Sequence, residues 1–350
     1  MKQIIFIGTS PINLLKGYLI AKENASTEIL FIDKHERLGG AWYSDTSPNG
    51  LEIECGCHIW TYCPEVYDYL SNELHIEMEN MKPSPIFKYG RTNLSYPLYT
   101  IKNSYQYIIK NAAMFRFSEL KNIKNNPEIS WRIFGKKNQY PKAGSPVLIE
   151  RLKELLDQLS NVKFEYGKVI NEVVCRDQIE VITDDKKYVC DKLYTTSVSS
   201  FSKISNQEKE LELSHSQRDY IHVLAKASKK PKYKATYHRL VNDPIIHRIT
   251  DVSYQAQHKE HLFLAGILED AFEKCNSEEL TNHLKTYLIK NNVIDSETEL
   301  TFVKNHVFPT YYIKPEDRKK LQNFDPRVEC FYSIDLMYGF YYILKNHQLI

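Results

Sequence analysis

The chain lacks several features that mark membrane and nucleic-acid-binding proteins. None of its apolar runs approaches the ~18–20 residues that span a bilayer, and Met1–Gln3 leads directly into an apolar segment, so we expect neither a membrane span nor a signal peptide. Charge of one sign is not in excess, because 46 basic and 44 acidic residues give a net charge of +2. This balance gives no electrostatic reason to expect nucleic acid or an anionic membrane as a partner.

Paired cysteines and domain linkers are also lacking. The seven cysteines are odd in number and scattered over 350 residues, which is typical of a reduced, cytoplasmic protein. Cys55, Cys57, His58 and Cys63 lie close in sequence but lack the paired C-x-x-C spacing of structural zinc sites, so we predict no metal site. No internal repeat and no segment rich in Pro, Gly or Ser divides the chain. We therefore expect two interleaved lobes rather than separate domains in series.

What the sequence does contain is a strand–helix–strand order at its amino end. Residues 4–7 and 29–32 are continuous apolar runs, typical of parallel strands covered on both faces, and residues 11–23 have helical spacing. This order predicts a βαβ unit in a parallel sheet. Further on we expect an antiparallel meander at 162–166, 169–174, 179–183 and 187–189, a buried strand at 190–196, and helices at 64–74, 145–159, 277–290 and 338–346.

The segment Gly8–Asn13 occupies the position of a G-x-G-x-x-G dinucleotide turn, but only the first of the three glycines is present. Ser10 is small and can donate a hydrogen bond to a phosphate, whereas Asn13 adds bulk where helix and strand pack closely. The helix N-terminus still offers N–H groups and partial positive charge to an anion. Asp33 ends the second strand, where a carboxylate can accept hydrogen bonds from a ribose. The alternative is an ordinary helix–strand turn with an Asp at the strand end.

The residues after Asp33 favour the dinucleotide. Arg37-x-Gly39-Gly40-x-x-x-Ser44 resembles the second fingerprint of the flavoprotein superfamily that contains amine oxidases, protoporphyrinogen oxidases, phytoene desaturases and UDP-galactopyranose mutases. The resemblance implies FAD as the cofactor. It also implies the α/β fold class, with an FAD/NAD(P)-binding Rossmann-like domain and an interleaved α+β substrate domain.

The resemblance extends to residues 50–60, which look like the superfamily strand that ends in Gly-x-His close to the isoalloxazine. It implies that His58 is catalytic, as a hydrogen-bond donor or proton shuttle near the flavin, while a buried structural histidine is the alternative. Near the carboxyl end, residues 307–311 resemble the approach to the last FAD motif of the superfamily. Residues 331–335 follow where the superfamily has a strand ending in Gly-Asp or Gly-Arg, which implies that Asp335 meets the ribityl chain. The residues that the resemblance assigns to FAD are Gly8, Ser10, Pro11, Asn13, Asp33, Lys34, Arg37, Gly39, Gly40, Ala41, Trp42, His58, Val169, Asp335 and Gly339.

The same resemblance predicts the domain boundaries. A discontinuous FAD-binding domain is expected at 1–75, 140–205 and 307–350, and a substrate domain at 76–139 and 206–306.

Two His-Arg pairs lie in the second part of the expected substrate domain, at 238–239 and 247–248. Arginine forks recognise carboxylate or phosphate groups, whereas the alternative is a β-hairpin with solvated charges. The residues predicted to contact the substrate are Tyr96, Arg239, Arg248 and Tyr311.

Three classes of function remain open at this point. An amine oxidase-like oxidoreductase would move a hydride from a small polar substrate to flavin N5, with the protein orienting the substrate. A UDP-galactopyranose mutase-like isomerase would act on a sugar nucleotide through reduced FAD, although the C-terminal arginine of the mutases is not found. A degenerate member of the fold would bind a nucleotide or a partner without redox chemistry. NAD(P)H stays open as a reductant.

Overall fold

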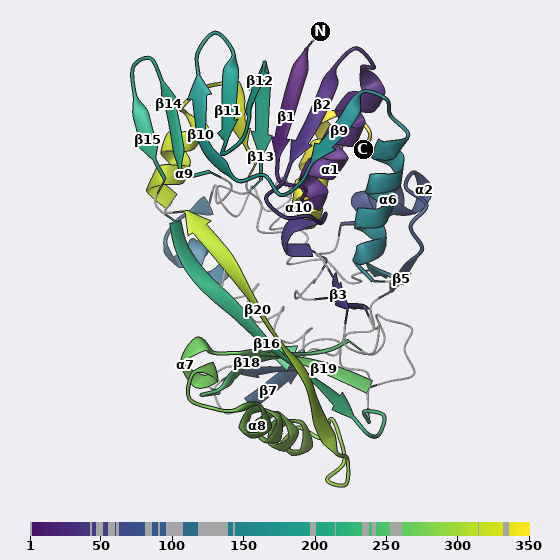
Figure 1. Cartoon of the computed structure of the whole chain (residues 1–350). Helices are drawn as coiled ribbons and strands as arrows, with labels where there is room; N and C mark the ends of the chain where they lie inside the picture. Colours follow the sequence, from purple (N-terminus) through teal and green to yellow (C-terminus); the bar gives the residue numbers. More distant parts are fainter. Residues whose placement is uncertain are drawn as a thin grey trace.

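The computed structural model consists of two bodies joined by a long two-stranded ribbon, and both chain ends lie in the upper body (Figure 1). The structure describes residues 2–42, 44–46, 52–54, 60, 63–80, 86–89, 92–95, 108–117, 139–142, 144–196, 201–213, 215–232, 238–239, 243–252, 261–313, 315–331 and 336–350.

The upper body is built on a five-stranded sheet in the order β21-β13-β1-β2-β9, in which every neighbouring pair is parallel. Its strands are β1 (Gln3–Ile7), β2 (Glu28–Ile32), β9 (Val162–Glu165), β13 (Lys192–Thr195) and β21 (Val328–Cys330). The expected βαβ unit is therefore present, and it forms the centre of the sheet.

The central strand β1 is apolar throughout because its alternate side chains enter two different cores. Ile4 and Phe6 pack with the helices on one face, while Ile5 and Ile7 pack with a second sheet on the other. The helices of the first face are α1 (Pro11–Glu23), α2 (Pro64–Asn72), α6 (Pro146–Asp157) and α10 (Leu336–Asn346), and α9 (Pro315–Gln322) contributes to the second core.

Four aromatic rings cross the helical face of the parallel sheet in one row. Phe6 stacks on Phe31 and on Tyr194 with centroid distances of 4.9 and 4.8 Å, and Phe31 stacks on Phe164 at 4.9 Å. Helix α1 lies directly on this row, because a Cβ built on Gly17 would come 2.3 Å from Cζ of Phe31. Only glycine fits at this position without a shift of the ring.

The second sheet has the order β12-β11-β10-β14-β15 and contains the predicted meander. Its strands are β10 (Ile170–Cys175), β11 (Ile179–Thr183), β12 (Lys187–Cys190), β14 (Lys203–Asn206) and β15 (Glu210–Glu212). The prediction that 162–166 opens the meander is wrong, since β9 pairs parallel with β2. The physical reason is the preceding helix α6, which returns the chain to the same edge of the sheet and so makes the strand parallel.

The expected strand at 190–196 is divided in two. β12 ends at Cys190 and belongs to the second sheet, whereas β13 begins at Lys192 and belongs to the parallel sheet. Between them, the carboxylate of Asp191 accepts a hydrogen bond from the backbone N–H of Gln3 at 2.8 Å.

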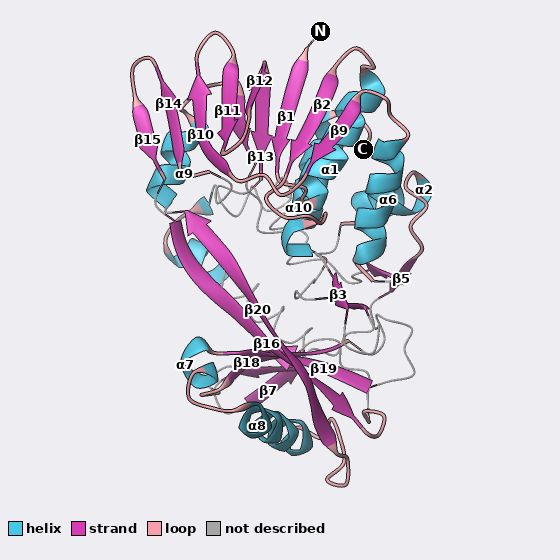
Figure 2. Cartoon of the chain, viewed as in Figure 1, coloured by secondary structure: helices cyan, strands magenta, loops and turns pink. Residues whose placement is uncertain are grey.

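The lower body is a seven-stranded sheet in the order β20-β16-β19-β18-β17-β6-β7. Its strands are β6 (Ile86–Tyr89), β7 (Thr92–Ser95), β16 (His215–Ala227), β17 (His238–Arg239), β18 (Ile246–Asp251), β19 (His261–Ile267) and β20 (Leu300–Ile313). β16 and β20 pair along their whole lengths and form the ribbon that reaches the upper body (Figure 2). β20 crosses the expected boundary between 306 and 307, and β15 extends the second sheet beyond 205.

The predicted helices occur near their expected positions, and α8 (Ser277–Lys290) matches its predicted residues because Asn276 and Glu279 form a capping box. The short α7 (Glu269–Phe272) precedes it. Further described elements include the 3₁₀ turn η1 (Gly40–Trp42) and two small antiparallel pairs, β3 (Ser44–Thr46) with β4 (Glu52–Glu54) and β5 (Met78–Asn80) with β8 (Gln139–Pro141). None of the helices in the described ranges is long and apolar enough to cross a membrane.

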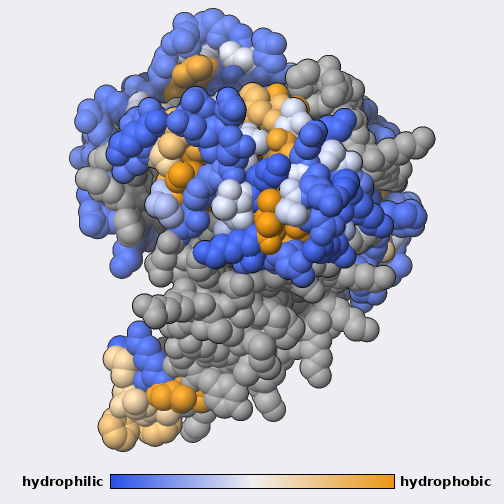
Figure 3. Space-filling model, turned by 90° about the horizontal axis from the view of Figure 1, so that it is seen from below, coloured by the Kyte–Doolittle hydropathy of each residue, from blue (hydrophilic) through white to orange (hydrophobic). Residues whose placement is uncertain are grey.

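Exposed apolar side chains are concentrated in residues 108–117, where Phe115 is 81% exposed. Seen from below, the described surface is largely hydrophilic, with scattered apolar residues and an apolar projection at one edge (Figure 3).

Candidate functional site

The turn between β1 and α1 lies at the carboxyl edge of the parallel sheet, where ligands bind in open α/β folds. Gly8 has a φ of +84°, which favours glycine, and its N–H donates to Ile32 O at 2.8 Å. Ser10 is the N-cap of α1, and its Oγ accepts from Asn13 N at 3.4 Å and lies 2.7 Å from Oγ1 of Thr196. Pro11 follows at the first helical position, where its missing N–H costs nothing. The turn thus has the backbone form of a dinucleotide turn.

Asn13 stands where the third glycine of the turn is expected, and its side chain holds the turn together. Nδ2 of Asn13 donates to Ile7 O and to Gly8 O, both at 2.8 Å, and the residue is 2% exposed. The close packing that the third glycine normally allows occurs one helical turn later, at Gly17. The steric conflict expected between Asn13 and the strand is therefore absent, because the side-chain amide of Asn13 points back to the end of β1.

Asp33 joins the first turn to the residues that follow β2. Its Oδ2 accepts from Thr9 N and Thr9 Oγ1 at 2.8 and 2.6 Å, and its Oδ1 accepts from His35 N at 2.9 Å. A carboxylate has about four acceptor sites, so the described residues use three and leave one for a ligand hydroxyl. The residue is only 5% exposed, and its main effect in the structure is to fix Thr9.

The two glycines of the second fingerprint pack against this first turn. Gly39 and Gly40 have φ values of +97° and +56°, and Gly39 N donates to Thr9 O at 3.0 Å and Thr9 Oγ1 at 3.2 Å. A Cβ on Gly39 would lie 2.5 Å from Cδ1 of Ile149 in α6. Among the described residues, the nearest atom to a Cβ on Gly40 would be Cα of Ser10, at 4.0 Å. The two fingerprints therefore form one continuous backbone surface.

The remaining predicted cofactor residues lie around the same edge. Lys34 and Arg37 are exposed between β2 and Gly39, Ala41 lies in η1, and Trp42 is half-buried against the helical core. Gly339 lets α10 approach α1, because a Cβ there would lie 2.7 Å from Cδ1 of Ile12 in α1. His58, Asp335 and the predicted substrate residue Tyr96 fall outside the described residues.

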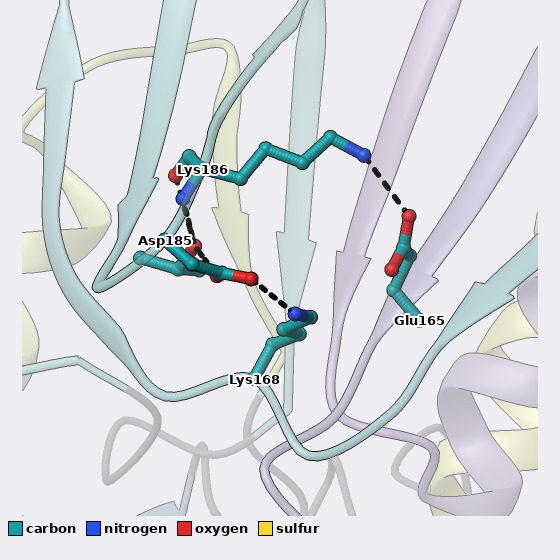
Figure 4. Close-up of polar contacts among 5 residues, drawn as sticks. Glu165, Lys168, Asp185 and Lys186 are labelled. Carbon is teal, nitrogen blue, oxygen red and sulfur yellow. Dashed lines mark hydrogen bonds and ion pairs between the residues drawn. The ribbon is translucent and has the colours of Figure 1, made fainter.

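Val169 lies on the second-sheet side of the site and is 53% exposed. The preceding residue Lys168 donates its N–H to Asp33 O at 3.0 Å, and its ammonium pairs with Asp185. Lys186 pairs with Glu165 of β9 at 3.1 Å, so the turn between β11 and β12 is held against the parallel sheet (Figure 4). These contacts fix Val169 near the end of β2.

Glu54 is a buried carboxyl that sequence patterns do not indicate, since Glu52 and Glu54 alternate with apolar residues as on a solvated strand. It accepts hydrogen bonds from the hydroxyl of Tyr140 and the N–H of Ser145. Trp60, fully buried, packs on Tyr140 with a centroid distance of 5.3 Å. Glu54 and Trp60 are thus both buried, on either side of the segment that carries His58.

Burial raises the pKa of the Glu54 carboxyl above its ordinary value, although the hydrogen bonds from Tyr140 and Ser145 act in the opposite direction. The folded state then holds this proton more strongly than the unfolded state. Its contribution to stability is full below pH 4.5, the ordinary pKa, and is lost as the pH rises through the folded-state pKa. Glu54→Gln should therefore gain stability relative to the parent chain between pH 5 and pH 8. The expected gain is about 1.4 kcal/mol for each tenfold change in the ionisation constant.

Urea unfolding at several pH values measures this difference, with the exposed Glu79→Gln as the control for loss of a carboxylate. A stability difference between Glu54→Gln and the parent chain that does not change with pH would contradict the raised pKa.

Those of the predicted substrate residues that the structure describes, Arg239, Arg248 and Tyr311, lie on the lower sheet, away from the nucleotide turns. Arg239 and Arg248 are cross-strand partners in the antiparallel β17–β18 pair, which confirms the strand pairing of the alternative, a β-hairpin with solvated charges. Arg248 itself is half-buried. Tyr311 lies in β20 opposite Gln217 of β16. Nη2 of Arg248 contacts Nε2 of His222 at 2.5 Å. Sequence reasoning missed His222, whose only signal is a polar residue in an otherwise apolar stretch of strand.

Comparison with known proteins agrees with this geometry. Residues 7–72 match the family model of the NAD(P)-binding Rossmann-like domain. No curated protein matches the chain in sequence. The structure of putrescine oxidase bound to putrescine is similar, with a TM-score of 0.66 at 11% identity over 99% of this chain and 98% of that chain.

Two further solved structures are similar over nearly the whole chain. Reduced UDP-galactopyranose mutase has a TM-score of 0.66 at 12% identity, covering 100% of this chain and 96% of that chain. An Exiguobacterium sp. 255-15 protein described as a protoporphyrinogen oxidase has a TM-score of 0.64 at 11% identity, covering 99% and 98%.

These similarities establish the fold. The class is an α/β protein with a Rossmann-like nucleotide domain and additional antiparallel sheets. More narrowly, the chain has the fold seen in putrescine oxidase and UDP-galactopyranose mutase, which confirms the fold that the sequence resemblance implied.

Proposed function

We propose that this chain is an FAD-dependent oxidoreductase that oxidises a small polar substrate by hydride transfer to flavin N5. The observation that carries the proposal is the contact between the two fingerprint turns, in which Gly39 N donates to both oxygens of Thr9. Small residues and glycines line both turns, so a pyrophosphate can approach the backbone closely.

The residues at the edge of the parallel sheet fit an adenine dinucleotide. The N-terminus of α1 offers positive partial charge to a phosphate, and Asp33 keeps one acceptor site for a ribose hydroxyl. Gly40 has a left-handed backbone and no described atom closer than 4.0 Å to its missing Cβ. Val169 presents an exposed apolar side chain on the side where the adenine is proposed to lie.

FAD, when bound, would supply the hydride acceptor, and the protein would bind and orient the substrate and exclude water. In this proposal His58 donates a hydrogen bond or moves a proton near the flavin. Its segment begins after Glu54 and ends before Trp60, both buried in the upper body. NAD(P)H as a reductant and a cytoplasmic location belong to the same proposal.

Purified protein should be yellow or become yellow with added FAD, because the two turns are expected to retain the dinucleotide. The absorption spectrum after desalting measures this occupancy. Protein that stays colourless and takes up no FAD would contradict the proposal and favour a degenerate fold member that binds a nucleotide or a partner without redox chemistry.

A mutase-like isomerase that acts on a sugar nucleotide is the second candidate. It is favoured by the similarity to reduced UDP-galactopyranose mutase over the whole of this chain. Turnover that requires prior reduction with dithionite would indicate the isomerase. Bleaching of the flavin by substrate under anaerobic conditions would instead indicate the oxidoreductase.

A further inference from the structure

A row of polar residues crosses the lower sheet at one level. His222 of β16 has two cross-strand partners, His306 of β20 on one side and Gly266 of β19 on the other. Gly266 in turn pairs with Arg248 of β18. Direct cross-strand partners carry their side chains on the same face of a sheet. The two histidines and the arginine therefore share one face.

This face is the one opposite α8. The neighbouring residues in the three inner strands pack on α8 in one apolar cluster, and they are Val223, Ala265 and Ile249. Since side chains alternate along a strand, His222, Gly266 and Arg248 point the other way. In Figure 1, α8 lies below the sheet, on the side away from the upper body, so the polar row lies on the side of the nucleotide turns.

Gly266 has no side chain and so leaves a gap in the polar row, which the side chains of His247 and Arg248 occupy. β18 has a register shift between Ile246 and Arg248, which makes His247 an additional residue of the strand. A Cβ on Gly266 would lie 2.6 Å from Nε2 of His247, so this imidazole rests directly on the glycine. The side chain of Arg248 spans the same gap to reach His222.

The hydrogen bond between Arg248 and His222 determines which of the two side chains carries the positive charge. A guanidinium has donors only, so Nε2 of His222 must accept, and a neutral His222 carries its proton on Nδ1. His222 is completely buried, whereas His247 and Arg248 are partly exposed. Among the described residues, Arg248 has no carboxylate partner, and its one hydrogen bond is to this imidazole. A half-buried cation to which the described residues supply no counter-ion favours an anion, and the remaining N–H groups of the fork can donate to it.

We propose that Arg248 and His247 bind an anionic group of the substrate, a carboxylate or a phosphate, and that His222 is a positioning residue for Arg248. The proposal rests on the proposed function in placing the substrate between the two bodies. It narrows the substrate class from small polar molecules to anions.

Titration of the protein, with FAD added, by two simple anions tests this site. Inorganic phosphate is followed by its ³¹P linewidth and acetate by saturation transfer to its methyl protons, and glucose serves as the neutral probe. Arg248→Met should weaken binding of the preferred anion at least about tenfold, because it removes the charged hydrogen bonds. The matched control Arg176→Met, at an exposed arginine of the second sheet, should leave binding unchanged. Whichever anion binds more tightly identifies the group.

Substitution of His222 separates positioning from direct contact. His222→Leu should weaken anion binding, and His222→Gln should restore part of it, because a Gln carbonyl can accept from Arg248.

If Arg248→Met does not fold, Arg248→Lys keeps the charge but loses the fork, and it should still weaken binding. Equal anion binding by the parent chain and the Arg248 variant, or no anion binding by the parent chain, overturns the proposal.

The outcomes also separate this proposal from the proposed function. Arg248-dependent anion binding by protein that takes up no FAD supports the anion site and contradicts the flavin function. FAD uptake without Arg248-dependent anion binding overturns the anion site alone.

Discussion

Replacing Asn13 by glycine, which restores the third glycine of the dinucleotide turn, should lower the free energy of unfolding by about 2–4 kcal/mol. The amide of Asn13 donates to Ile7 O and Gly8 O, and a glycine removes both bonds from a buried place. Each lost bond costs about 1 kcal/mol, with a further cost where a buried oxygen is left without its donor. The midpoint of urea unfolding, followed by circular dichroism, measures the effect.

The matched control is Asn282→Gly, at an exposed position of α8. It reports the difference in helix propensity alone, about 0.3–0.5 kcal/mol. If Asn13→Gly destabilises the protein no more than Asn282→Gly does, the two hydrogen bonds do not hold the turn together.

Gly40→Arg should reduce the affinity for FAD at least about 100-fold, which corresponds to about 3 kcal/mol. The substitution places a long side chain between the second fingerprint and Ser10, where the proposed pyrophosphate lies. Flavin content after desalting and titration with free FAD measure the loss.

Gly40→Ala separates obstruction from backbone strain. Alanine at φ +56° carries a similar strain of about 1–2 kcal/mol, but its Cβ would lie 4.0 Å from the nearest described atom. It should retain FAD under conditions where Gly40→Arg does not. Unchanged FAD occupancy in Gly40→Arg would show that the second fingerprint is wrongly placed.

Local signals in the sequence predicted the framework of the fold. The apolar runs of β1 and β2 and the capping residues of α8 each encode their own element. The placement of β9 was not predictable from its own residues, because its partner β2 precedes it by more than a hundred positions. The alternation of side chains along β9 also suits either the parallel sheet or the antiparallel meander.

The residues of the candidate site were predictable at the positions where the backbone conformation requires a glycine. Gly8, Gly39 and Gly40 all have positive φ, and their spacing identified both turns. The roles of Asn13 and Glu54 were not predictable, because each depends on contacts made only after the turns and the core assemble. The contact of Arg248 with His222 likewise depends on Gly266 in the strand between them.

Gly17 and Phe31 have a consequence for ligand binding. Since the ring of Phe31 occupies the space where any other residue would carry a Cβ, α1 can rest on the sheet at one axial position only. A shift by one residue would bring Lys16 or Tyr18 onto the ring. The height of the helix N-terminus above the sheet is therefore set by the protein alone. An anion that binds there meets donors already in place, and little of its binding free energy is spent on ordering the chain.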